Sequence, residues 1–159
     1  MLPHHPQRLM RWPALVLASL LTLTVASLES GCASGPFGVA STAPLYQQLG
    51  GVDNITRFSD KTMDRVSQDP RTRRTFEGVK MPYFKASVSA YLCKVADGPC
   101  VYEGQDMKKS HADLNLGGSE FELMVTVLRE EMDAAGVPTA AKNELLRRLA
   151  PSKRDIVTH

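Results

Sequence analysis

The chain has 159 residues and is close to neutral, with 19 Lys and Arg against 17 Asp and Glu. A balance this even gives no basis for a nucleic-acid partner or for attraction to an anionic membrane surface. The part of the chain beyond its leader has a length that suits one domain with one core. Composition therefore excludes partners that need strong charge, and function has to be sought in the motifs.

The chain begins with a segment typical of an export signal. An uncharged apolar run from Ala14 to Leu28 follows a short basic start, and it is too short for a comfortable membrane span. Cys32 follows "LESG" as in a bacterial lipoprotein signal, although Glu29 stands where such signals carry an aliphatic residue. We therefore expect residues 1–31 to be a signal peptide. The protein is then exported, either as an ordinary cleaved protein of the periplasm or as a lipoprotein anchored to the outer membrane through lipid on Cys32.

Residues 32–44, "CASGPFGVASTAP", are small, uncharged and rich in Gly, Ser and Pro, which predicts a flexible tether. Helical patterns follow it, and no alternating run is long enough to indicate a sheet. The first is a short piece, "LYQQLGG". The second is a longer helix whose apolar stripe begins at Val52 and ends before Asp69-Pro70. The basic cluster "RTRR" that comes next is typical of a solvated helix face.

A third helix begins near Pro82, a residue suited to the first turn, and stops at Asp97-Gly98-Pro99. Cys93 and Cys100 lie on either side of that stop, at a separation that does not match the C-x-x-C pairs of zinc or redox sites. In an oxidising compartment such a pair is expected to form a disulfide. The alternative is two buried free thiols.

The remaining segments are also helical. A loop leads to a short segment that carries His111. "SEFE" is typical of a capping box, with Ser119 as the cap and Glu122 bonding back to it, and it begins a fourth helix. The last helix follows Pro138. We predict an all-α fold in a single domain, residues 45–159, without internal repeats.

These helices are short, so they depend on packing for stability and leave a thin core. A large apolar cofactor between them would supply the missing interior. His111 is the only histidine outside the two ends of the chain. An imidazole ligand for such a cofactor would have to come from this residue. The alternative is a solvated histidine on a helix surface.

Four segments resemble, in their order, the truncated haemoglobins of group I; they are "LYQQLGG", "DPRTRRTF", "DGPCVYEGQDMKKSH" and "ELLRRLAPSKRDIV". The resemblance runs from Leu45 to about Val157 and implies a two-on-two helical sandwich around haem. It implies that His111 is the proximal iron ligand and that Phe76 packs on the haem face. One histidine is what haem iron needs from a globin. By position, Tyr102 and Lys108 are candidates to bind the haem propionates, or they are a loop-packing tyrosine and a solvated lysine.

The chain departs from that family on the side of the haem where ligands bind. The family often has a tyrosine donor on its second helix, where Met63 stands, and frequently has glutamine on the next helix, where Phe84 and Val88 stand. All three replacements are apolar. Tyr83 and Tyr91 lie on the same helix and could supply a donor, although the apolar stripe favours packing for both. We therefore do not expect high-affinity oxygen storage.

The resemblance implies a haem-binding globin that binds a diatomic ligand, whether oxygen, nitric oxide or carbon monoxide. An electron donor is a candidate partner. A first alternative is an enzyme on the same scaffold, a nitric oxide dioxygenase or weak peroxidase. This chemistry needs stable oxygen binding or a proton donor beside the iron, and the apolar set opposes both. A second alternative is an envelope lipoprotein that keeps the globin fold for interaction.

Overall fold

The structure is a computed structural model that describes residues 42–159. The expected signal peptide, Cys32 and the tether up to residue 41 lie outside the described residues. The elements are all helical: α1 (Leu45–Gln48), α2 (Gly51–Gln68), the 3-10 turn η1 (Arg73–Phe76), α3 (Met81–Val95), α4 (Met107–His111), α5 (Gly118–Ala134), α6 (Thr139–Leu149), η2 (Ala150–Ser152) and α7 (Lys153–Ile156). Over this range the extended pairing is limited to one isolated parallel bridge, Leu116 with Val157. The all-α prediction is confirmed.

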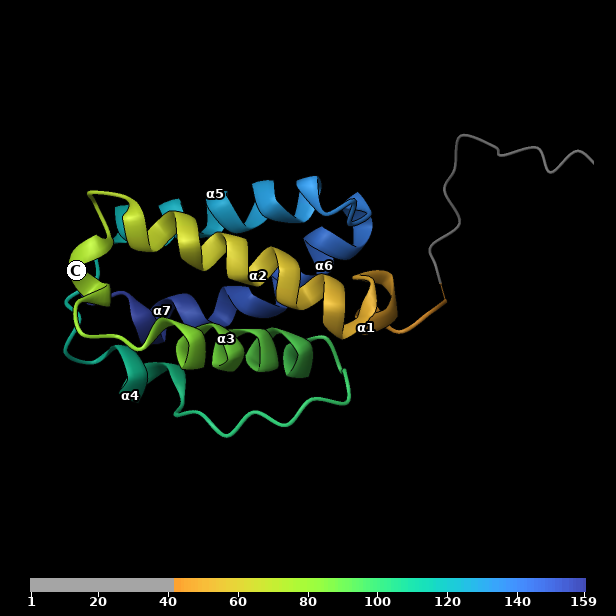
Figure 1. The fold of residues 1–159 in the computed structure, drawn as a ribbon, viewed down its shortest axis with the longest axis horizontal. Helices are drawn as coiled ribbons and strands as arrows, with labels where there is room; N and C mark the ends of the chain where they lie inside the picture. Colours follow the sequence, from red (N-terminus) through yellow and green to blue (C-terminus); the bar gives the residue numbers. More distant parts are fainter. Residues whose placement is uncertain (1–41) are drawn as a thin grey trace, which may run out of the picture. The chain divides into compact units, whose positions relative to one another are not determined.

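The helices form two pairs packed on each other. Helix α2 lies along α3 and also packs on α5, while α6 contacts both α3 and α5 (Figure 1). This is the two-on-two arrangement that the resemblance implies. Helix α4, η1 and α7 lie together at one end, and α1 lies at the other. None of the described helices has the length and apolar character needed to cross a membrane.

Helix α2 shows how the sequence pattern becomes packing. It begins after Gly50, whose left-handed φ of 88° turns the chain out of α1, and it ends where Asp69 becomes extended before Pro70. Its buried side chains recur at helical spacing; they are Ile55, Phe58, Ser59, Thr62, Met63 and Val66. Val52 is 39% exposed and stands outside this stripe. The predicted start of the stripe was therefore one turn too early.

The start of α5 differs from the expectation. The helix begins at Gly118, and the Gly117 N–H donates to the Glu120 Oε2 at 2.9 Å. The predicted cap at Ser119 with Glu122 was therefore wrong by two residues. The cause is tertiary, because Glu120 also binds an arginine of η1, while Glu122 pairs with Lys153 of α7.

The buried side chains fall into two clusters. The first, which we call the closed cluster, joins α1, α2, α3, α5 and α6; its buried members are Leu45, Leu49, Ile55, Phe58, Leu92, Cys93, Ala96, Leu128, Met132, Val137, Ala141 and Leu145. The second, the half-exposed cluster, has the buried residues Met63, Val66 and Val127 and the partly buried Phe76, Met81, Phe84, Val88, Leu123 and Met124. The two clusters share α2, α3 and α5.

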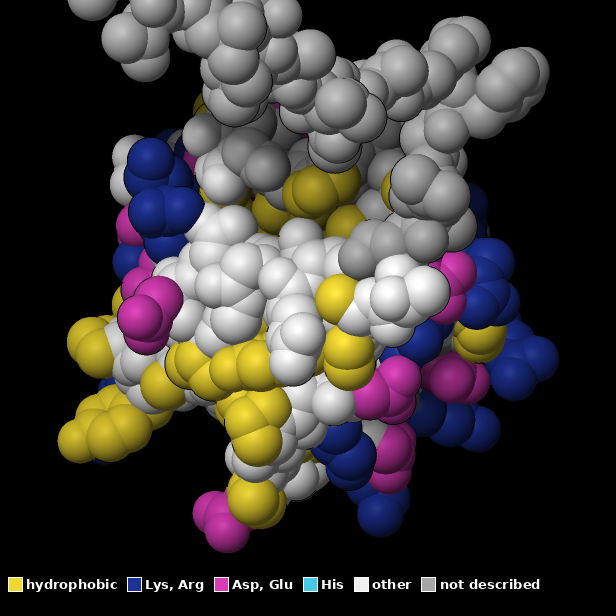
Figure 2. Space-filling view, turned by 90° about the vertical axis from the view of Figure 1, so that its right-hand side faces the viewer, with side chains coloured by type: hydrophobic (Ala, Val, Ile, Leu, Met, Phe, Trp, Pro, Cys, Tyr) yellow, Lys and Arg dark blue, Asp and Glu magenta, His cyan; other side chains and the backbone are white. Residues whose placement is uncertain are grey.

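The α1 end of the molecule presents a mixed surface. Viewed from this end, apolar side chains form a band between groups of acidic and basic side chains, and no histidine reaches the visible surface (Figure 2). His111 lies in α4, at the opposite end of the helical domain (Figure 1).

Candidate functional site

The half-exposed cluster brings together the residues that the resemblance placed around a haem. Met63, from α2, is 2% exposed, and Phe84 and Val88 of α3 pack in the same cluster. Phe76 of η1 meets Phe84 edge to face, with ring centroids 5.8 Å apart. Four of the expected site residues thus form one apolar surface. Phe76, Phe84 and Val88 keep part of their area exposed, whereas Met63 is buried.

His111 is the last residue of α4, a helix that Asp106 begins by accepting a hydrogen bond from the Lys109 N–H. The His111 Nδ1 lies 2.8 Å from the carbonyl oxygen of Met107. A carbonyl can only accept, so this contact is a hydrogen bond when Nδ1 carries a proton; the Ser110 hydroxyl lies 2.9 Å from the same nitrogen. A ring held in this way is prepared to ligate a metal through Nε2.

The two candidates for the haem propionates differ in their surroundings. Tyr102 donates its hydroxyl proton to the Gln105 carbonyl at 2.7 Å, and its ring packs on Tyr91 with centroids 5.2 Å apart. These contacts match the alternative of a loop-packing tyrosine. Lys108 is exposed on α4. The structure does not bring Tyr102 into the half-exposed cluster.

The two tyrosines of α3 do not join the apolar surface either. Tyr83 is 79% exposed, which contradicts the expectation that it packs in the core. Tyr91 packs on Tyr102 and against the closed cluster. Burial and the nearby Tyr102 raise the pKa of Tyr91 above its ordinary value of 10.0. Neither hydroxyl is placed beside Met63 in this structure.

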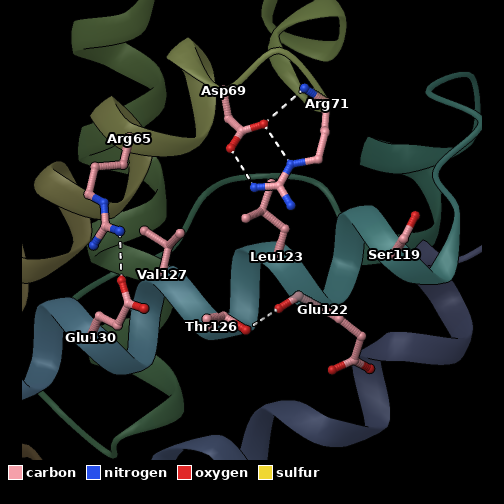
Figure 3. A pocket seen from close by; sticks show the side chains of 9 residues that line it. All are labelled: Arg65, Asp69, Arg71, Ser119, Glu122, Leu123, Thr126, Val127 and Glu130. Atoms are coloured by element: carbon pink, nitrogen blue, oxygen red, sulfur yellow. Dashed lines mark hydrogen bonds and ion pairs between the residues drawn. The ribbon is translucent and has the colours of Figure 1, made fainter.

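A separate open groove of about 520 Å³ lies between the end of α2 and α5 (Figure 3); it is lined by Arg65, Asp69, Arg71, Ser119, Glu122, Leu123, Thr126, Val127 and Glu130. Arg71 donates two hydrogen bonds to Asp69 from its side chain and lowers the pKa of that carboxyl to about 2. The floor residues Leu123 and Val127 also belong to the half-exposed cluster. Arg65 pairs with Glu130 and Arg71 with Asp69, while Glu122 pairs with Lys153 of α7, so the groove is a polar border of the apolar site.

Cys93 and Cys100 are joined by a disulfide in the structure, with Cα atoms 5.8 Å apart. The bond links the end of α3 to the loop that leads to α4. Gly98, between the two cysteines, has no space for a side chain, because an added Cβ would lie 2.5 Å from the Tyr46 ring and 2.6 Å from the Cys93 sulfur. The turn therefore depends on glycine through close packing.

Sequence reasoning missed Arg74 as part of the site. The cluster "RTRR" was interpreted as a solvated face, and Arg73 and Arg74 are indeed exposed. Arg74 nevertheless donates to the carbonyl oxygens of Leu114 and Asn115, at 2.9 and 3.0 Å, and binds Glu120 at 2.8 Å. Its partners lie some forty positions away, so no local pattern could have indicated them.

These residues fit a haem. A flat apolar ring system is complemented by partly exposed aromatic and aliphatic side chains, which Phe76, Phe84 and Val88 provide beside the buried Met63. An axial position needs an imidazole nitrogen as ligand, and His111 offers its Nε2, since its Nδ1 lies against the Met107 carbonyl. One imidazole ligand beside an apolar wall suits haem iron. Other metal ions are usually held by several carboxylates or thiolates.

Comparison with known proteins agrees with a haem site. Residues 44–158 match the model of the family described as bacterial-like globin. A group 1 truncated hemoglobin of Nostoc commune is 30% identical over 113 residues, covering 71% of this chain and 96% of that protein. Another, of Mycolicibacterium paratuberculosis, is 28% identical, covering 77% of this chain and 90% of that protein.

Two solved structures support the fold. The truncated hemoglobin of Tetrahymena pyriformis in its Fe(III) form has a TM-score of 0.68 at 23% identity, covering 72% of this chain and 98% of that one. The 2/2 hemoglobin of a Synechococcus species, in the cyanomet state with covalently attached heme, has a TM-score of 0.68 at 21% identity and covers 74% and 100%. The chain therefore belongs to the bacterial-like globin family, among the relatives of the group 1 truncated haemoglobins, and is a haem-binding globin.

Proposed function

We propose that the protein binds a diatomic gas through a haem whose iron His111 ligates, with Met63, Phe84 and Val88 forming the surface against which the gas binds. The hydrogen bond from the His111 Nδ1 to the Met107 carbonyl is the observation that supports the proximal role most directly. With Nδ1 as the donor, Nε2 is the ring nitrogen left to ligate iron, and the contact limits rotation of the ring. Haem, when bound, would supply the iron to which the gas binds, and His111 would hold that iron.

The composition of the ligand side favours ligands that need no hydrogen bond. Oxygen is retained better when a side chain donates to it, and such a bond is worth about 1.5–3 kcal/mol. Met63, Phe84 and Val88 have no hydrogen to donate, and Tyr83 and Tyr91 are placed elsewhere. We expect fast oxygen release and ready oxidation to the ferric form. Carbon monoxide and nitric oxide should bind with little hindrance.

Replacing His111 tests the proposal. In the His111→Gly variant we expect the ferric and ferrous optical spectra to lose the features of histidine ligation, and added imidazole to restore them by occupying the space of the missing ring. His159→Gly is the matched control, because it removes a histidine that lies in the tail. Unchanged coordination in His111→Gly would refute the assignment of the proximal ligand.

The enzymatic alternatives receive less support from the site. A nitric oxide dioxygenase or a peroxidase needs stable oxygen binding or a proton donor near the iron. The side chains gathered at the half-exposed cluster are apolar. We therefore propose that the protein binds a ligand and does not rely on a catalytic step. Turnover of peroxide or of nitric oxide with added reductant, at rates above those of free haem, would favour an enzyme and an electron-donor partner.

We further propose that the protein is exported. The proposal rests on the apolar run of residues 14–28, on Cys32 after a small residue, and on the pairing of Cys93 with Cys100, which suits an oxidising compartment. If Cys32 is acylated, the globin domain is held at the membrane by the segment that follows it. Intact mass of the mature protein tests both statements, because a chain that retains Glu29 would exclude a lipoprotein.

A further inference from the structure

The connection from α4 to α5, residues 112–117, directly follows His111 and is held by contacts from outside itself. Its carbonyls at Leu114 and Asn115 accept hydrogen bonds from the Arg74 guanidinium, at 2.9 and 3.0 Å. The next carbonyl, that of Leu116, accepts from the Thr158 N–H at 2.9 Å. Three successive carbonyls are therefore bound by distant parts of the chain, which is more restraint than an ordinary surface loop receives.

Glu120 completes this set of contacts. One of its oxygens accepts from Arg74 at 2.8 Å, and the other accepts from the Gly117 N–H at 2.9 Å. The Glu120 side chain is 13% exposed, whereas the Arg74 side chain is 50% exposed. The ion pair is thus partly screened by water. The geometric restraint comes from the backbone hydrogen bonds that the pair orients.

The restraint reaches His111 through the backbone. The Leu114 N–H donates to the His111 carbonyl at 3.1 Å, and the Leu114 carbonyl accepts from Arg74. Leu114 therefore links Arg74 to His111 through two hydrogen bonds. Asn115, which Arg74 also binds, is in the left-handed region with φ of 47°. Few residues other than glycine adopt that conformation readily, although asparagine is among them. The external hydrogen bond helps to keep it there.

Arg74 also lies in the element that carries Phe76. It lies in η1, two positions before Phe76, whose ring packs on Phe84. One guanidinium therefore connects the segment that carries Phe76 to the segment that carries His111. Only arginine offers a planar fork that can donate in three directions at once, and a lysine ammonium at the same place would reach fewer of these acceptors with poorer geometry.

From these contacts we infer that Arg74, held by Glu120, is a positioning residue for the proximal histidine: it sets the orientation of the His111 ring and its separation from the Phe76 wall. This inference rests on the proposed function, since it needs His111 to be the iron ligand. It assigns a role in haem geometry to a residue that does not itself belong to the apolar surface.

The test compares Arg74→Ala with Arg73→Ala, which removes the neighbouring exposed arginine. Two quantities are measured on the haem-loaded protein: the iron–histidine stretching frequency of the ferrous form by resonance Raman, and the rate of haem transfer to a globin acceptor. For Arg74→Ala we expect a shifted or broadened stretch and about tenfold faster haem loss, as three hydrogen bonds are removed. Arg73→Ala should match the unmodified protein.

Two milder variants guard against simple loss of folding. Arg74→Lys keeps the charge and should show a smaller shift of the stretch and slower haem loss than Arg74→Ala. Glu120→Gln keeps the shape of the side chain and should shift the stretch less than Arg74→Ala. In the haem-free form of both variants, hydrogen exchange at the Leu114 amide should become faster. A loop that merely stabilises the fold would change the unfolding midpoint without moving the iron–histidine stretch.

The outcomes separate the two proposals. If His111→Gly abolishes histidine ligation while Arg74→Ala and Glu120→Gln leave the stretch and haem loss unchanged, the positioning role is refuted and the proximal role stands. If His111→Gly retains the original coordination, both proposals fail. A shift in the Arg74 variants that Arg73→Ala does not reproduce supports the positioning role.

Discussion

The closed cluster and the half-exposed cluster use the same helices for different purposes. On α2, Phe58 is 0% exposed in the closed cluster, and Met63 follows it by little more than one turn in the half-exposed cluster. On α3, Leu92 belongs to the first and Phe84 to the second. The closed cluster is completed by protein alone, through α1 and α6. The half-exposed cluster presents large apolar side chains with part of their surface still accessible, as a cofactor wall requires.

The difference shows that apolar periodicity does not distinguish a protein core from a cofactor site. The stripe on α2 is continuous, because core packing and cofactor packing both select apolar residues at helical spacing. What separates the two clusters is the identity of the opposing surface, which is a tertiary property. Partial exposure of aromatic side chains in a folded domain is therefore a better indication of a cofactor wall than the pattern of the sequence.

The largest expected effect comes from truncating one phenylalanine in each cluster. Phe58→Ala should lower the free energy of unfolding of the haem-free protein by about 3–5 kcal/mol, because it removes a fully buried ring. Phe84→Ala, whose ring is partly exposed, should cost about 1–2 kcal/mol in the same form. Urea unfolding of the haem-free variants measures both. Equal losses would mean that the second cluster is an ordinary core.

The disulfide belongs to the closed cluster, where Cys93 is 1% exposed. Replacing Cys93 and Cys100 together by serine should lower the free energy of unfolding by roughly 2–3 kcal/mol, since the loop that the bond closes is short. The optical spectrum of the haem-loaded protein should stay the same. Alkylation followed by intact mass checks that the purified protein carries the bond. Two alkylated thiols without reductant would contradict its formation.

On the haem side, Met63→Tyr sharpens the comparison by adding a donor to the apolar wall. We expect oxygen release to slow by about tenfold or more, because one hydrogen bond to a charged acceptor exceeds 1.4 kcal/mol. Carbon monoxide release should change little. Stopped-flow kinetics measure both, and Met63→Leu serves as the apolar control. If the unmodified protein already releases oxygen slowly, and Tyr83→Phe or Tyr91→Phe abolishes this, the donor lies where the structure does not place it.

The smallest expected effect is a response to acid. The Glu144 carboxylate of α6 accepts hydrogen bonds from Arg147 and Arg148, which lower its pKa from 4.5 to about 2. Its pKa is depressed in the folded state, so its stabilising contribution is present above pH 4.5 and lost as the pH falls through about 2. Glu144→Gln should flatten this loss slightly, since the pair is exposed. Unfolding midpoints on either side of this interval test it.

The elements with local signals were predictable. The extent of α2 followed from its apolar stripe and from Asp69-Pro70, and the stop of α3 followed from Asp97-Gly98-Pro99. The apolar set of Met63, Phe84 and Val88 followed from the resemblance, and the structure gathers these residues in one cluster. Their roles toward haem, like that of His111, stay predictions.

Features set by distant partners were not predictable. The start of α5 moved because Glu120 bonds both to Gly117 and to Arg74, a residue of another element. Tyr83 was expected to pack but is 79% exposed. The contacts that decide the start of α5 join segments far apart in the chain, and periodicity carries no information about them.

The bridge between Leu116 and Val157 has a consequence for the order of events during synthesis. In the segment after His111, the Leu116 carbonyl accepts a hydrogen bond from the N–H of Thr158, which follows α7. This hydrogen bond can form only after residue 158 has been synthesised. The helices of the closed cluster, up to Leu145, are available earlier. Haem is therefore expected to load late, into a scaffold whose protein core has already assembled.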